Sequence, residues 1–217
     1  MGRTTESPTS PAASEQESPT DWGKLGGTDH AYIGEGPTVV ILGDSLVMMS
    51  RKALRADLKG TSSRLAGRAG EGLSGGGQST AWGKPLMLTL AKDLRDSNPD
   101  VTVIALGTND ALSPALGLPA AIDAWNKMTQ DLSGSCLVAV TVSETSKAEN
   151  FSQHTAKEIN KVMRRDADVI VDWNALGSSD RYTRPDDIHP TPLGQAHYAK
   201  LIRQGIDECL APPKTNG

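Results

Sequence analysis

The 217-residue sequence lacks several features that would point to particular classes of protein. It has no block of basic residues and a formal net charge of −4. We therefore expect no nucleic-acid partner, because phosphate binding needs clustered lysine and arginine. The longest apolar runs, such as 101–106 and 136–142, are far shorter than the roughly 18 residues of a membrane-spanning helix. We expect no transmembrane segment, and the N-terminus lacks the apolar core of a secretory signal peptide.

Cysteine is also scarce, with two residues, Cys136 and Cys209. They have neither metal-ligand spacing nor a CxxC pattern, so the sequence predicts no metal site. Two interpretations of the pair stay open. They are either two small buried apolar side chains or a disulfide formed in an oxidising compartment.

The chain divides by composition into two parts. Residues 1–35 are rich in Ser, Thr, Pro, Glu and Gly and have few large apolar side chains. Such a segment buries too little surface to offset its ordering entropy, so we predict a flexible tail or linker. Trp22 and Tyr32 are candidate anchors of part of it on the domain surface. Residues 36–212 are predicted to form one globular domain, whose oligomeric state the sequence does not indicate.

From Pro37 onward, short apolar runs alternate with longer helical patterns. The runs are continuous, which is typical of strands covered on both faces. Alternation of this kind predicts a parallel sheet with right-handed crossovers, in a three-layer α/β/α sandwich of about five strands. The predicted strands cover about 39–42, 63–66, 101–106, 137–142 and 169–171, and the predicted helices about 46–59, 78–97, 118–132, 152–165 and 192–210.

Reactive side chains follow these strands where ligands bind in such sheets, beyond the carboxyl ends. The run at 39–42 leads directly into Gly43-Asp44-Ser45-Leu46, which places Ser45 at a strand tip. If a helix begins there, its free N–H groups and positive dipole end suit a developing oxyanion. The alternative is that Asp44 or Ser45 is an ordinary helix N-cap.

A second strand end carries an asparagine. The run at 101–106 is followed by Gly107-Thr108-Asn109-Asp110. The side-chain amide of Asn109 can donate a hydrogen bond to an oxyanion, as backbone N–H groups do. The alternative is an Asx-turn, which Asn and Asp favour for local hydrogen-bonding reasons.

The third group of residues precedes the last predicted helix. His189 is a candidate base for a hydroxyl nucleophile, because imidazole titrates near neutrality. Asp186, three residues earlier, is placed to hold the tautomer of the imidazole. We expect the neighbouring Asp187 to be solvated, and Thr191 to cap a helix that begins at Pro192. The alternative is an ordinary surface histidine.

Together these motifs resemble those of the SGNH/GDSL hydrolases, over about residues 37–210. Gly43–Leu46, Gly107–Asp110 and Asp186–Thr191 resemble the first, third and fifth sequence blocks of that family. Val171-Asp172-Trp173 and the run Thr191–Gln195 are similar to those of actinobacterial-type members. The resemblance implies the flavodoxin-like SGNH hydrolase fold and no cofactor.

The resemblance also implies roles for individual residues. Ser45 would be the nucleophile, and Asp186 and His189 would complete a catalytic triad. The oxyanion would be held by the backbone N–H of Ser45, the Asn109 side chain and a glycine N–H from the family's second block. We expect that glycine to be Gly70, which lies soonest after the predicted strand at 63–66.

The match is looser at two places. The second block has no clear signature here, so Gly72 is an alternative to Gly70, and a merely flexible surface loop is another. The family commonly has glycine where Asp187 stands, which changes the stiffness or charge of that loop without removing a catalytic group.

The expected activity is hydrolysis of carboxylic esters through an acyl-enzyme. A single phenylalanine and few aromatics give no sign of a large apolar pocket, so we expect short acyl groups. The resemblance implies a carbohydrate or other small alcohol as the alcohol portion. One alternative is an extracytoplasmic O-acyltransferase domain that moves an acyl group to a cell-envelope sugar. Another is a non-catalytic binding module. We expect a secreted or extracytoplasmic protein, tethered through the N-terminal linker, while a cytoplasmic location stays open.

Overall fold

The computed structural model describes Asp29 and residues 31–75, 90, 91, 94, 97–113, 117–177 and 179–212. Its sheet has five strands, all parallel, in the order β2-β1-β3-β4-β5. They are β1 (Thr38–Gly43), β2 (Ser62–Gly67), β3 (Val101–Ala105), β4 (Cys136–Val140) and β5 (Val169–Val171). The parallel sheet and the five strands expected from the apolar runs are confirmed.

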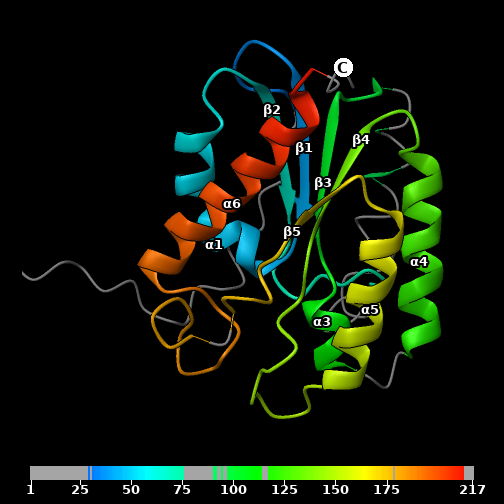
Figure 1. The fold of residues 1–217 in the computed structure, drawn as a ribbon, viewed down its shortest axis with the longest axis vertical. Helices are drawn as coiled ribbons and strands as arrows, with labels where there is room; N and C mark the ends of the chain where they lie inside the picture. Colours follow the sequence, from blue (N-terminus) through cyan, green and yellow to red (C-terminus); the bar gives the residue numbers. More distant parts are fainter. Residues whose placement is uncertain are drawn as a thin grey trace, which may run out of the picture.

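Helices cover both faces of the sheet (Figure 1). The helices with full bounds are α1 (Ser45–Asp57), α3 (Thr108–Leu112), α4 (Leu118–Asp131), α5 (Gln153–Asp166) and α6 (Pro192–Leu210). Helices α1 and α6 pack together on one face, and α4 and α5 pack together on the other. Each face has its own apolar core. The three-layer α/β/α sandwich is therefore confirmed.

Local chemistry explains where the last helix begins and how it packs. Thr191 is the N-cap of α6, and its Oγ1 accepts a hydrogen bond from Gly194 N at 3.0 Å, as expected from the sequence. Pro192 occupies the first turn, where its missing N–H costs nothing. Gly205 lets α6 approach the sheet, because a Cβ there would lie 2.8 Å from Val171 Cγ2.

The expected helices and the observed ones differ at two places. Of the range 78–97, the structure describes residues 90, 91, 94 and 97, which are helical, and the rest lies outside the described residues. The helix α3 was not expected. It begins directly after Gly107, whose positive φ of 118° turns the chain sharply at the end of β3.

The end of the predicted tail is attached to the domain along the outer edge of β2. Ile33 and Ser63 exchange two main-chain hydrogen bonds of 2.9 Å, and Asp29 N donates to Leu65 O. Tyr32 packs against the core that α4 and α5 cover, as expected of an anchor. Trp22, the other candidate anchor, lies outside the described residues. The boundary at residue 36 stays a prediction.

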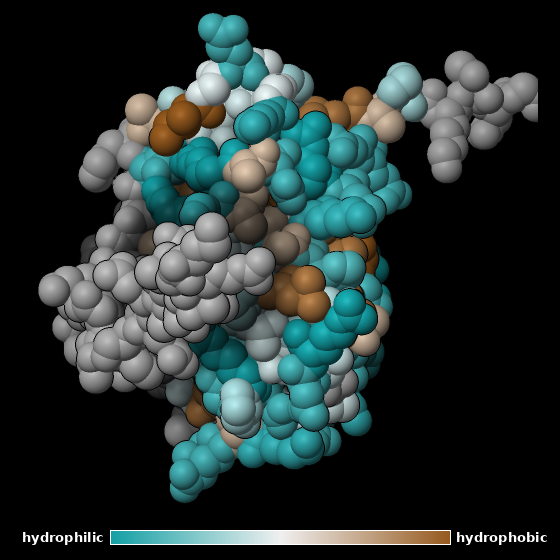
Figure 2. Space-filling view, turned by 90° about the vertical axis from the view of Figure 1, so that its left-hand side faces the viewer, coloured by the Kyte–Doolittle hydropathy of each residue, from teal (hydrophilic) through white to brown (hydrophobic). Residues whose placement is uncertain are grey.

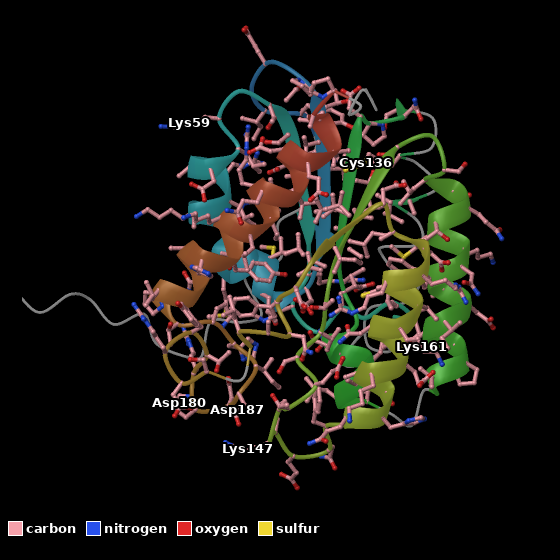
Figure 3. The ribbon with its side chains drawn as sticks, in the orientation of Figure 1. Lys59, Cys136, Lys147, Lys161, Asp180 and Asp187 are labelled. Carbon is pink, nitrogen blue, oxygen red and sulfur yellow. A yellow bond between two sulfur atoms is a disulfide. The ribbon has the colours of Figure 1, made fainter. Side chains whose placement is uncertain are left out.

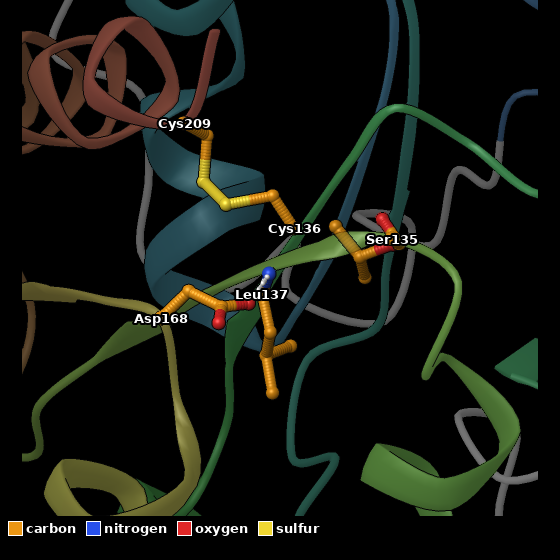
Figure 4. Close-up of a disulfide and its surroundings, with 6 residues drawn as sticks. Ser135, Cys136, Leu137, Asp168 and Cys209 are labelled. Atoms are coloured by element: carbon orange, nitrogen blue, oxygen red, sulfur yellow. Dashed lines mark hydrogen bonds between the residues drawn. A yellow bond between two sulfur atoms is a disulfide. The ribbon is translucent and has the colours of Figure 1, made fainter. Parts of the chain in front are cut away.

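A disulfide joins Cys136, at the start of β4, to Cys209, near the end of α6 (Figure 4). Of the two interpretations of the cysteines, the structure therefore has the disulfide. It closes a loop with a sequence separation of 73 residues. Beside it, Leu137 N donates to the Asp168 carboxylate at 2.8 Å, which ties the starts of β4 and β5 together.

The molecular face that carries α1 and α6 is mainly hydrophilic, with apolar residues in small separate patches (Figure 2). Ile33 and Leu193 are the large apolar side chains that stay exposed among the described residues. No helix in the described part of the chain combines the length and the apolar character that crossing a membrane requires.

Candidate active site

The carboxyl ends of the strands meet at one edge of the sheet, where α3 and the loop between β5 and α6 also lie (Figure 1). The strand order reverses direction at β1, because the chain passes to β2 on one side and to β3 on the other. Ligands in sheets of this type bind at such a switch point. Ser45 follows β1 and Asn109 follows β3, so both candidate residues lie at this crevice.

Three of the predicted residues form one chain of hydrogen bonds. Ser45 Oγ lies 3.1 Å from His189 Nε2, and His189 Nδ1 lies 2.7 Å from Asp186 Oδ2. The serine and the histidine are 144 positions apart in the sequence, so only the fold brings them together. The arrangement matches a hydroxyl nucleophile, a base, and a carboxylate that orients the base.

Asp186 is held in place by its own loop. Its Oδ1 accepts hydrogen bonds from Ile188 N at 3.0 Å and His189 N at 2.9 Å, which leaves Oδ2 for the imidazole. Partial burial raises the pKa of Asp186, but the hydrogen bonds from the His189 ring and from these N–H groups outweigh it. The pKa of Asp186 is therefore below its ordinary value, and the carboxylate stays charged opposite the ring.

The helix start explains why Ser45 is free to face the histidine. Asp44 is the N-cap of α1, with Oδ1 accepting from Leu46 N at 2.9 Å, and Ser45 is the first helical residue. The sequence left Asp44 and Ser45 as alternative N-caps, and in the structure Asp44 is the N-cap. The Ser45 side chain is 6% exposed, and its backbone N–H belongs to the first turn of a 13-residue helix.

Asn109 lies in the first turn of α3 and not in an Asx-turn. Its Nδ2 donates to the main-chain oxygen of Glu71 at 2.8 Å and lies 3.4 Å from Asp44 Oδ2. The amide is thus directed to the region between the start of α1 and the glycine-rich loop, of which the structure describes residues 68–75. This region adjoins Ser45, the residue that follows Asp44.

Asp110 holds part of the glycine-rich loop through hydrogen bonds. The buried Asp110 carboxylate accepts hydrogen bonds from Leu73 N at 2.7 Å and from Ser74 N at 3.0 Å. Ser74 Oγ adds a third, at 2.6 Å. Gly72 makes this approach possible, because a Cβ there would lie 2.6 Å from Asp110 Oδ2.

The two candidate glycines therefore differ in surroundings. Gly72 has a packing reason to be glycine, and Gly70 has a backbone reason, a φ of 77°. The N–H groups of Glu71, Leu73 and Ser74 are engaged with Arg68 O or Asp110. Gly70, closest in sequence to β2, remains our choice for a donor from this loop.

The carboxyl group of Asp44 is almost fully buried beneath the site. Burial raises the pKa of Asp44 from 3.8 to about 7, against the opposing hydrogen bond from Leu46 N, and the charge of Asp110 raises it further. Burial, with the nearby charge of Asp44, also raises the pKa of Tyr198 on α6 well above its ordinary value. Asp44, which directly precedes Ser45, therefore titrates near neutral pH.

The expectation that Asp187 is solvated is wrong. Its side chain is 10% exposed and forms an ion pair with Lys147, Nζ to Oδ2 3.6 Å, across the loop that follows β4. Its φ of 55° is in the left-handed region, where glycine is usual, which accords with the family's glycine at this position. The tight turn is why the side chain faces the neighbouring loop.

A cavity of about 450 Å³ lies beside Asp186 on the side of the loop that follows β4. Its walls are mainly charged, and Figure 3 shows Lys147, Asp180 and Asp187 together at this edge of the molecule. The wall residues are Lys147, Ala148, Glu149, Asp180, Pro185, Asp186 and Asp187. Asp186 is the one member of the Ser45–His189–Asp186 series among these wall residues.

Sequence reasoning missed two residues of this region, Glu71 and Asp110. Both carboxylates are buried, and both hold the glycine-rich loop in place. A signal for Glu71 was its position as a charged residue with glycine on both sides, since a charge is unusual in so confined a loop. A signal for Asp110 was its place directly after Asn109.

Similar solved structures are enzymes of acyl chemistry. The catalytic domain of peptidoglycan O-acetyltransferase A from Streptococcus pneumoniae is 19% identical, with a TM-score of 0.60 over 82% of this chain and 96% of that one. The esterase EstA from Pseudoalteromonas sp. is 15% identical, with a TM-score of 0.59 over 80% and 98%. A carbohydrate esterase of family 3 from Talaromyces cellulolyticus is 16% identical, with a TM-score of 0.59 over 79% and 97%.

No protein-family model and no curated protein matches the sequence. At such low identity, the likeness to the solved structures shows the fold. The chain has the fold of the SGNH hydrolases, as its motifs predicted.

Proposed function

We propose that this chain is a serine esterase that cleaves carboxylic esters through an acyl-enzyme. The observation that carries the proposal is the hydrogen-bonded series Ser45–His189–Asp186 at the carboxyl edge of the sheet. The esterase fold of the similar structures supports it independently.

In the proposed first half-reaction, His189 Nε2 takes the proton of the Ser45 hydroxyl as Oγ attacks the ester carbonyl carbon. The oxyanion accepts hydrogen bonds from Ser45 N, Asn109 Nδ2 and Gly70 N. Asp186 stabilises the imidazolium. When the tetrahedral intermediate collapses, the bond to the alcohol oxygen breaks, and His189 returns its proton to the leaving alcohol.

In the second half-reaction, His189 takes a proton from water, whose oxygen attacks the acyl carbon. The bond to Ser45 Oγ then breaks, the serine is protonated again, and the free acid leaves. The proposed substrate is a short acyl group on a carbohydrate or other small alcohol. The carbohydrate esterase among the similar structures supports this alcohol portion.

The decisive experiment replaces the nucleophile. Ser45→Ala should abolish hydrolysis of short p-nitrophenyl esters, because the acyl-enzyme cannot form. Ser50→Ala is the matched control: it lies on the same helix, is fully buried, and its Oγ has no hydrogen-bond partner within the described part of the structure. Full activity of Ser45→Ala would show that Ser45 is not the nucleophile.

A second candidate is transfer of the acyl group to a sugar hydroxyl instead of water. The likeness to the peptidoglycan O-acetyltransferase domain supports this second candidate, since the match covers 96% of that domain. The same Ser45 acyl-enzyme would serve both reactions. Product analysis with an added carbohydrate acceptor separates them, since an acylated sugar indicates transfer and free acid indicates hydrolysis.

A non-catalytic binding module on the same scaffold is tested by chemical labelling. A fluorophosphonate reacts with an activated serine, so labelling of Ser45 supports an enzyme, and failure to label supports a binding module.

We also propose a secreted or extracytoplasmic location. The disulfide between Cys136 and Cys209 supports it, since disulfides persist in oxidising compartments.

A further inference from the structure

A buried ion pair lies within the glycine-rich loop, next to the residues with proposed chemical roles. The Glu71 side chain has no exposed surface. Its Oε2 accepts a hydrogen bond from Arg68 Nε at 2.9 Å and lies 2.7 Å from Arg68 Nη2. Burying a carboxylate in a short loop is costly, and the paired guanidinium offsets that cost only if the geometry is well fixed.

The main chain of the same glutamate holds the Asn109 side chain. Glu71 O accepts from Asn109 Nδ2 at 2.8 Å, while Glu71 N donates to Arg68 O at 3.1 Å. An amide has two N–H groups, and this bond engages one of them. The second is directed toward Asp44 Oδ2, at 3.4 Å, which is long for a hydrogen bond. That N–H is therefore held only weakly, and a substrate oxygen placed nearer would accept it instead of Asp44.

Arg68 connects this arrangement to the strand that carries the serine. Arg68 N donates to Gly43 O at 3.2 Å and so extends the pairing of β1 and β2 by one step. Gly43 stands two residues before Ser45. A continuous series of contacts therefore runs from the tip of β1 through Arg68 and Glu71 to the Asn109 amide.

We propose that Glu71, paired with Arg68, is a positioning residue that aims the Asn109 amide at the oxyanion. This inference rests on the proposed function. The ion pair fixes the side chain of Glu71 and with it the orientation of the Glu71 carbonyl. The carbonyl, in turn, holds one N–H of Asn109 and leaves the other, weakly held by Asp44, for the oxyanion. Glu71 itself touches no reacting atom.

The experiment is a double-mutant cycle between Glu71 and Asn109, measured as kcat and KM for p-nitrophenyl acetate. Glu71→Ala should lower kcat about 10- to 100-fold, less than complete loss of an oxyanion donor, with KM nearly unchanged. Glu71→Gln keeps an acceptor oxygen for Arg68 and should recover part of kcat. In the Asn109→Ala background, both Glu71 changes should have little further effect, because the group they position is gone.

A role in stability alone predicts a different pattern. Asp207→Asn is the control, because it removes a carboxylate from an arginine pair, Arg203 Nη2 to Asp207 Oδ1 2.8 Å, on α6. It should leave kcat unchanged. If folded Glu71→Ala has wild-type kcat, or if Glu71→Ala lowers kcat equally in the Asn109→Ala background, the positioning role is wrong.

Two further variants keep the result interpretable. If Glu71→Ala does not fold, Glu71→Gln and Arg68→Lys are each compared with the wild type instead. Glu71→Gln keeps the shape of the glutamate, and Arg68→Lys keeps the charge of the arginine. Failure of the proposed function is recognised separately, because Ser45→Ala would then retain activity. Loss of activity in Ser45→Ala together with wild-type kcat in the folded Glu71 variants overturns this inference alone.

Discussion

At the scale of single residues, Asp44 joins two roles through one carboxyl group. It caps α1, and it lies 3.4 Å from the Asn109 amide. Its pKa near 7 means that its charge changes in the range where the proposed chemistry would operate. In the folded protein the carboxyl group is protonated at pH values at which it is ionised in the unfolded chain.

The free energy of unfolding should therefore depend on pH through Asp44. A raised pKa contributes stability that is fully present below pH 3.8 and is lost as pH rises through about 7. Asp44→Asn should remove this loss and become more stable than the wild type above pH 7, by at most about 4 kcal/mol. Urea unfolding at pH 4 to 8 measures the difference. Asp123→Asn, on an exposed part of α4, controls for the change in net charge. Parallel curves for the wild type and Asp44→Asn would contradict the assignment.

Ser45 and Asn109 could be located from the sequence because they follow strand ends, and His189 because it precedes the last helix. Ser45, Asn109 and His189 stand in short motifs that the fold must bring to one edge. The burial of Asp44 and the ion pair of Asp187 could not be predicted. Both depend on side chains from distant parts of the chain, such as Lys147. No local sequence pattern indicates that these side chains come close.

At the scale of elements, the strands were predictable because each is a continuous apolar run between polar segments. The longer helices were predictable from their apolar spacing and, for α6, from the cap at Thr191. The helix α3 was not, because five residues are too few for a periodic pattern. The attachment of the segment before β1 was not predictable beyond Tyr32, because it depends on main-chain pairing at Ile33 and on one buried charged residue.

That residue is Asp29, whose side chain is 8% exposed. Its carboxylate forms ion pairs with Arg51 and Arg55 of α1 and accepts a hydrogen bond from Leu65 N at 2.8 Å. Asp29→Ala should lower the free energy of unfolding by about 2 kcal/mol, because two partly buried arginines lose their partner.

The matched control for Asp29 is Glu158→Ala, which removes a carboxylate from an exposed pair with Lys161 on α5. It should change the free energy of unfolding by less than about 1 kcal/mol. Thermal and urea unfolding of the two variants measure the contrast. Equal losses would show that Asp29 contributes no more than a surface pair.

At the scale of the whole molecule, the covalent cross-link and the candidate site lie at opposite edges of the sheet. Cys136 stands at the start of β4, while Lys147, Asp180 and Asp187 lie beyond the strands' carboxyl ends (Figure 3). A change at the disulfide should therefore affect the stability of the fold and not directly the groups with proposed chemical roles.

Replacing both cysteines by serine should separate stability from activity. Opening a loop of 73 residues increases the freedom of the unfolded chain, so we expect a loss of about 2–4 kcal/mol in the free energy of unfolding. Ester hydrolysis measured well below the melting temperature should stay at the wild-type rate. The wild type after reduction serves as a second test of the same bond. A large fall in kcat with unchanged stability would contradict this separation.

The segment that lies along β2 also bears on how copies of this protein behave together. Ser63 and Leu65 are two of the three positions of β2 whose main-chain N–H and C=O groups face away from the sheet, and Ile33 and Asp29 take up the four groups of these two residues. A second molecule therefore finds no row of unsatisfied groups along this stretch on which to add a strand. We therefore expect the segment preceding β1 to limit edge-to-edge association of this strand at high concentration.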